Sequence, residues 1–119
     1  MTLKVFLGVF LGGGIGATLR FFLSTLISPS NFWSTSAINV FGAFLAGLFF
    51  RYFEINSISN EARLFVMVGF LGAFTTFSAF AIDFFHIIRD ENYLVGFLYV
   101  FITVTGTILG FSLGFRMIT

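Results

Sequence analysis

The sequence predicts an all-α membrane protein with four transmembrane helices. Of its 119 residues, 58% are hydrophobic and only 9% are charged, and the mean hydropathy is +1.05. Because soluble domains carry roughly 25% charged residues, this composition places the chain in a lipid bilayer. A transmembrane helix needs about 20 mostly apolar residues, and four stretches meet that requirement, with polar residues between them.

Short polar segments separate the expected spans. We expect the first span to be retained, because its apolar run is longer than the roughly 7–15 residues of a signal-peptide core. It ends at a turn signal around Pro29, the only proline. No soluble segment follows, so residues 1–119 are expected to form one transmembrane domain. The predicted spans are about Leu3–Ile27, Phe32–Phe53, Glu61–Ile88 and Tyr93–Met117.

The third predicted span is unusual in its middle. Gly72 weakens a helix, and the adjacent Thr75 and Thr76 crowd the preceding turn, so we expect the helix to break there. A break in lipid frees backbone groups that must find protein, water or an ion. Phe77 and Phe80 follow three residues apart and so share one helix face. This pattern indicates an ion site, although a Gly/Thr-rich packing seam with lipid-facing Phe explains the same residues.

Further polar residues lie inside the other spans. Asn39 is in the middle of the second span, where its amide could donate to an anion or form an interhelical hydrogen bond. In the fourth span, Tyr99, Thr103 and Thr107 recur every four residues and place three hydroxyl groups on one helix face. An isolated Thr usually bonds to its own helix, but three hydroxyls on one face indicate a polar lining.

The composition also excludes several function classes. The sequence has no Cys and a single His, so thiol chemistry and a transition-metal centre are not expected. It shows neither a nucleophile–base pair nor a Gly-rich phosphate loop with a Lys, so we do not expect an enzyme. A net charge of +1 gives no reason to expect a nucleic-acid partner. Amide and hydroxyl donors, together with positive ring edges, instead favour a small anion over a cation.

The charges in the loops bear on orientation. With four spans, both termini and the central loop share one side, which carries four basic residues against two on the other. So weak a bias predicts insertion in both orientations and an antiparallel homodimer with a two-fold axis in the membrane plane. The basic residues are Lys4, Arg51, Arg63 and Arg116 on the first side, and Arg89 with a snorkelling Arg20 on the other.

Three motifs resemble those of the Fluc (CrcB-type) fluoride channels, small four-span proteins of bacteria. They are GGGIGATLRFF at Gly12–Phe22, TSAINVFGAFLAG at Thr35–Gly47 and GFLGAFTTFSAF at Gly69–Phe80. The resemblance implies a multi-pass protein of the bacterial inner (plasma) membrane that exports fluoride passively, rejects chloride and so provides fluoride resistance. It also implies a dual-topology antiparallel homodimer with two permeation paths, each using side chains from both subunits.

The resemblance assigns roles to individual residues. It implies that two rings and an amide line the path, that hydroxyl groups form a polar track along the fourth helix, and that two backbone carbonyls bind a central structural Na+. The rings are Phe77 and Phe80, the amide is Asn39, the track is Tyr99, Thr103 and Thr107, and the sodium carbonyls are those of Gly72 and Thr75.

Two further positions carry less weight, and two others depart from the family pattern. Asp83 falls where the family often has an acidic residue near the vestibule, and Arg20 belongs to the first motif; snorkelling anchors explain both nearly as well. Ala73 replaces a common second Gly and can change the bend of the break. Ala79 replaces a common Thr, so Ser78 or Thr76 is expected to carry more of the donor work.

Two other readings predict different sequences or behaviour. A small dual-topology coupled exporter would need a membrane-embedded Glu in the first helix, and residues 3–27 contain none. A structural membrane subunit without transport would tolerate Ala at Asn39, Phe77 and Phe80 without loss of ion flux.

Overall fold

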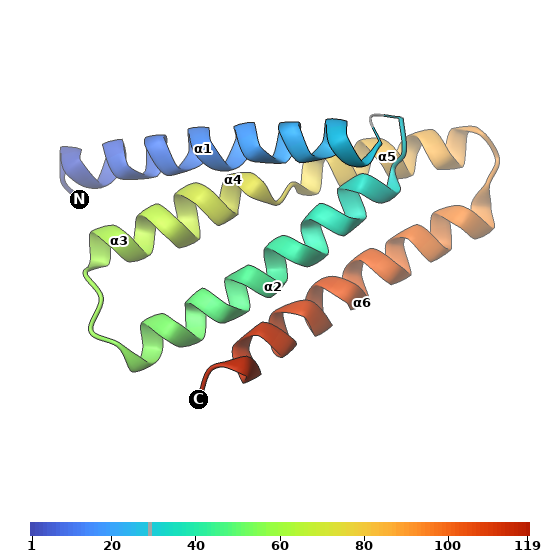
Figure 1. Ribbon diagram of the computed structural model, residues 1–119. Coiled ribbons are helices and arrows are strands. Elements are labelled where there is room, and N and C mark those ends of the chain that lie inside the picture. Colours follow the sequence, from blue (N-terminus) through green and yellow to red (C-terminus); the bar gives the residue numbers. More distant parts are fainter. Residues whose placement is uncertain (29) are drawn as a thin grey trace.

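The computed structural model describes residues 1–28 and 30–119, which are helical throughout except for short connections (Figure 1). Four helical spans are long and apolar enough to cross a membrane, as predicted. The turn predicted around Pro29 includes a position outside the described residues. The elements are α1 (Leu3–Ile27), α2 (Trp33–Ile55), α3 (Asn60–Leu64), η1 (Phe65–Leu71), α4 (Gly72–Phe74), α5 (Phe77–Arg89) and α6 (Tyr93–Met117).

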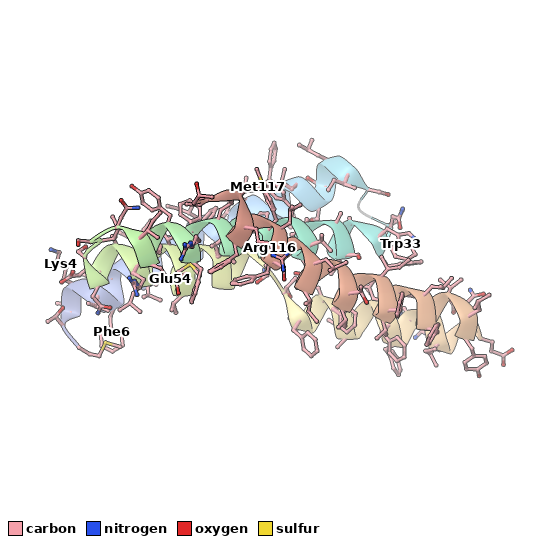
Figure 2. The ribbon with its side chains drawn as sticks, turned by 90° about the horizontal axis from the view of Figure 1, so that it is seen from below. Lys4, Phe6, Trp33, Glu54, Arg116 and Met117 are labelled. Atoms are coloured by element: carbon pink, nitrogen blue, oxygen red, sulfur yellow. The ribbon has the colours of Figure 1, made fainter. Side chains whose placement is uncertain are left out.

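The spans alternate in direction. Both termini and the α2–α3 connection lie toward one end of the molecule, and the α5–α6 connection lies at the other (Figure 1). Figure 2 shows the same two ends: Lys4 and Glu54 lie toward the end with the termini, and Trp33 lies toward the opposite end. The chain is therefore a multi-pass membrane protein.

The third span consists of several segments. Ser59 caps its start, its hydroxyl oxygen accepting from the Ala62 N–H at 3.3 Å, and residues 65–71 then form a π-helical stretch, η1. Helical geometry ends at Phe74. Thr75 and Thr76 are extended, with φ/ψ of −82°/152° and −147°/117°, and α5 begins directly after them. Gly72 itself remains helical, so the extended residues are the two threonines that the sequence singles out.

Glycine residues let the backbones of neighbouring helices come into direct contact. A Cβ at Gly16 would overlap the Phe70 carbonyl oxygen, and one at Gly12 would meet the Phe65 carbonyl oxygen at 2.6 Å, so α1 lies directly against η1 and α4. Gly114 similarly approaches the Phe44 carbonyl and joins α6 to α2. Such contacts stabilise helix pairs in lipid, where apolar burial adds little. They hold α1 against the third span and α6 against α2.

Candidate functional site

A cleft of about 650 Å³ lies between α2, α6 and the third span. Its surface is mainly apolar, with a few polar groups, as in most binding sites for small ligands. The structure brings together on this cleft most of the residues that the sequence singles out. These are Asn39, Gly72, Thr75, Thr76, Phe77, Phe80, Thr103 and Thr107.

Asn39 is buried and pairs with the backbone of Thr76. Its Oδ1 accepts from the Thr76 N–H at 2.7 Å, and its Nδ2 donates to the Thr76 carbonyl at 3.0 Å. In an unbroken helix that N–H would bond to the carbonyl four residues back, at Gly72. The amide therefore satisfies a backbone group freed by the extended residues. It forms an interhelical bond, one of the two possibilities that the sequence left open, and keeps one N–H for another acceptor.

The carbonyl oxygens before α5 fall into two groups. Arg20 Nε donates to the Ala73 carbonyl at 3.1 Å, and the Thr75 N–H and hydroxyl both donate to the Leu71 carbonyl, at 3.1 and 3.0 Å. Among the described residues, no hydrogen bond reaches the carbonyl oxygens of Gly72 or Thr75. Both residues line the cleft. Two backbone acceptors are thus free for a ligand.

The start of α5 is capped by Thr76. Its hydroxyl oxygen accepts from the Ala79 N–H at 3.1 Å, which satisfies an orphan donor of the first turn. The same oxygen lies 3.1 Å from the Ser78 hydroxyl, and either group can be the donor. Ser78 is exposed and lies beside the cleft residue Thr76 rather than on the cleft. Thr76 and Ser78 therefore form a pair of hydroxyl groups at the start of α5.

Three aromatic rings form a continuous stack beside the cleft. The Phe77 and Phe80 ring centroids are 5.2 Å apart at 25°, and those of Phe80 and Tyr99 are 5.2 Å apart at 20°. Exposure falls along the stack, from 79% at Phe77 to 9% at Phe80 and 0% at Tyr99. Because the ring faces cover one another, the positive edges remain for a ligand in the cleft.

The three hydroxyl groups predicted on α6 have different surroundings. Thr103 and Thr107 line the cleft, and they donate to the Ser36 hydroxyl at 2.8 Å and to the Thr103 carbonyl at 2.5 Å. Tyr99 lies behind Phe80 and donates to Asp83 Oδ2 at 3.0 Å. The structure thus joins Thr103 and Thr107 to the cleft and pairs Tyr99 with Asp83. Each hydroxyl has a protein acceptor and must turn to reach an anion.

Two residues of the site, Ser36 and Gly42, were not predicted from the sequence. Ser36 is buried and accepts the Thr103 proton, while a Cβ at Gly42 would overlap the Thr75 methyl group. Both are three residues from Asn39 and so share its helix face. That spacing is the signal that could have identified them.

Arg20 on α1 contacts the backbone at the end of α4. Its Nε bonds to the Ala73 carbonyl, which has lost its helical donor beyond the extended residues.

Comparison with known proteins covers nearly the whole chain. A family model described as "CrcB-like protein, Camphor Resistance (CrcB)" matches residues 7–115. A "Fluoride-specific ion channel FluC" of Mesorhizobium japonicum is 42% identical over 89% of each chain. The proteins of that name from Phocaeicola vulgatus and Thermus thermophilus are 37% and 39% identical, over 97% and 94% of this chain and 98% and 93% of their own.

Proposed function

Because the chain belongs to the CrcB-like protein family, we propose that it is a fluoride-selective channel through which fluoride leaves the cell passively. The family acts in ion transport and is not a class of enzymes. The observation that carries the proposal is the cleft, where an amide donor, threonine hydroxyls and the edges of two stacked rings face one space. It is supported by relatives named as fluoride-specific ion channels, to which this chain is similar along nearly their full length.

The chemistry of the cleft suits an anion that only accepts hydrogen bonds. Asn39 keeps one free N–H, and Thr103 and Thr107 can rotate their hydroxyls from their present acceptors toward the cleft. Thr76 and Ser78 share a hydroxyl contact near the same position and can supply one more donor. Several donors are needed, because an anion leaving water must have its hydration replaced. The edges of Phe77 and Phe80 add a weaker attraction.

We propose that a second copy of the chain, inserted in the opposite orientation, completes the path. The supporting observation is Phe77, a large ring on the cleft that is 79% exposed in the single chain. A two-fold axis in the membrane plane would place a cleft on each side and so create two paths. The basic residues are few and are divided between the two sides, and so weak a bias permits insertion in either orientation.

A structural sodium ion between the two copies forms part of the same proposal. The described residues include no group of three or more His, Cys, Asp or Glu side chains that could hold a metal, so backbone oxygens would have to do so. The free carbonyl oxygens of Gly72 and Thr75 fit this need, because hard cations prefer oxygen ligands. Two oxygens leave the shell of a hard cation incomplete, and a symmetry-related copy would contribute two more.

The channel proposal is tested by the driving force for efflux. Liposomes holding purified protein and potassium fluoride are expected to release fluoride only when a potassium ionophore balances the charge. An imposed proton gradient without the ionophore should cause no release. Release driven by the proton gradient alone would instead establish a coupled exporter and overturn the passive mechanism.

Removing sodium tests the cation. When purification and assay use N-methylglucamine in place of sodium, we expect less dimer by chemical cross-linking and slower fluoride efflux, because the carbonyls would face each other without a cation. Returning sodium should restore both. Equal dimer and equal efflux in the two buffers would count against a site at Gly72 and Thr75.

A further inference from the structure

We infer that Asp83 and Tyr99 are positioning residues, whose hydrogen bond orients the ring stack of the proposed fluoride path. We call this pair the Tyr99–Asp83 latch. The inference rests on the proposed function, because it concerns how Phe80 and Phe77 are presented to the permeating anion. It gives both latch residues a role that requires neither of them to touch the anion.

The latch joins two helices at a half-buried point. Tyr99 on α6 is 0% exposed, and its hydroxyl donates to Asp83 Oδ2 on α5 at 3.0 Å. Asp83 has no ion-pair partner within the described part of the chain. An acidic side chain within a membrane-spanning segment is expected to have a polar partner, and the Tyr99 hydroxyl supplies one. The pair therefore has a preference to remain formed.

The ring of Tyr99 is enclosed on several sides. Phe32 and Trp33, at the start of α2, meet it edge-on, with centroid distances of 5.4 and 5.7 Å. Phe80 stacks on it at 20°. With its hydroxyl held by Asp83, the Tyr99 ring has a fixed plane and a fixed tilt. It is a rigid surface against which Phe80 is aligned.

The plane of the Tyr99 ring sets that of Phe80, which stacks on it, and Phe80 in turn sets the plane of Phe77. The Phe77 ring is largely exposed, and within the described residues Phe80 is its one aromatic neighbour. Asp83 lies three residues after Phe80, on the same face of α5. The latch thus ties the helix that carries both phenylalanines to the ring that sets their plane. Neither latch residue lines the cleft, whereas both phenylalanines do.

The test combines fluoride flux with the emission of Trp33, the single tryptophan, which contacts Tyr99. We expect Tyr99→Phe and Asp83→Leu each to slow fluoride efflux about two- to fivefold, the effect of losing one hydrogen bond. Both should also shift the Trp33 emission. The double variant should be no slower than either single one, because both remove the same bond. Asp83→Asn should restore flux and emission, since its amide oxygen still accepts.

Tyr93→Phe is the matched control, because Tyr93 is an exposed tyrosine at the start of the same helix. It should leave flux and emission unchanged. Wild-type flux and emission in both Tyr99→Phe and Asp83→Leu would overturn the latch, as would Asp83→Asn behaving like Asp83→Leu. A wild-type protein that carries no fluoride would overturn the proposed function instead, and the emission of Trp33 would still test the latch itself.

Discussion

Replacing Asn39 with Asp is expected to reduce fluoride efflux by about three orders of magnitude. A deprotonated carboxylate would put a fixed negative charge on the cleft. Two like charges about 4 Å apart repel by ~4 kcal/mol at an effective dielectric constant of ~20, which corresponds to ~1000-fold in rate. The carboxylate would also lack the N–H that now donates to the Thr76 carbonyl. Fluoride-electrode recordings from liposomes with equal amounts of protein measure the effect.

Asn56→Asp is the matched control for this charge. Asn56 follows α2, and its Nδ2 also donates to a backbone carbonyl, that of Tyr52, at 2.9 Å. It does not line the cleft. The control should conduct like wild type and elute as the same oligomer in size-exclusion chromatography. Wild-type efflux in Asn39→Asp would show that the path lies elsewhere.

Replacing Phe77 or Phe80 with Ile is expected to slow fluoride efflux about tenfold, and replacing both is expected to slow it further. Isoleucine keeps an apolar side chain but has no ring edge, so the attraction for the anion is lost. If each edge contact is comparable to an aromatic pair, its loss costs ~0.5–1.5 kcal/mol, and 1.36 kcal/mol is tenfold in rate. Initial efflux rates of the two single variants and the double variant measure this.

Phe85→Ile on the same helix separates the ring edge from a general loss of aromatic surface. Phe85 is 63% exposed and does not line the cleft, so its replacement should leave efflux unchanged. Cross-linking should show the same dimer in all variants. If Phe77→Ile and Phe80→Ile both conducted at the wild-type rate, the rings would have no part in conduction.

The helical architecture could be predicted because it depends on local sequence. Runs of about 20 apolar residues fix the number of spans, and the expected boundaries lie close to the observed ones. The second span, expected to end near Phe53, ends at Ile55, and the third runs from Asn60 to Arg89. The π-helical geometry of residues 65–71 was not anticipated. The stretch packs closely against α1, and no local sequence pattern that we used distinguishes π-helical from α-helical geometry.

The residues of the site could be predicted, but the hydrogen bonds between them could not. The bonds that define it join residues far apart in the chain: Asn39 to Thr76 across 37 positions, and Arg20 to Ala73 across 53. A sequence shows which groups are polar inside a span, but not which freed backbone group each will satisfy. Tyr99 illustrates the limit, because its four-residue spacing from Thr103 places it on their shared face while the packing of α5 encloses it.

Selectivity for fluoride is measured by parallel efflux of fluoride and chloride from liposomes. Both assays use the same protein preparation, the same potassium ionophore and sodium throughout. We expect rapid fluoride release and no chloride release above that of protein-free liposomes. Equal release of the two anions, or no release of either anion by a folded dimer, would rule out a fluoride-selective channel.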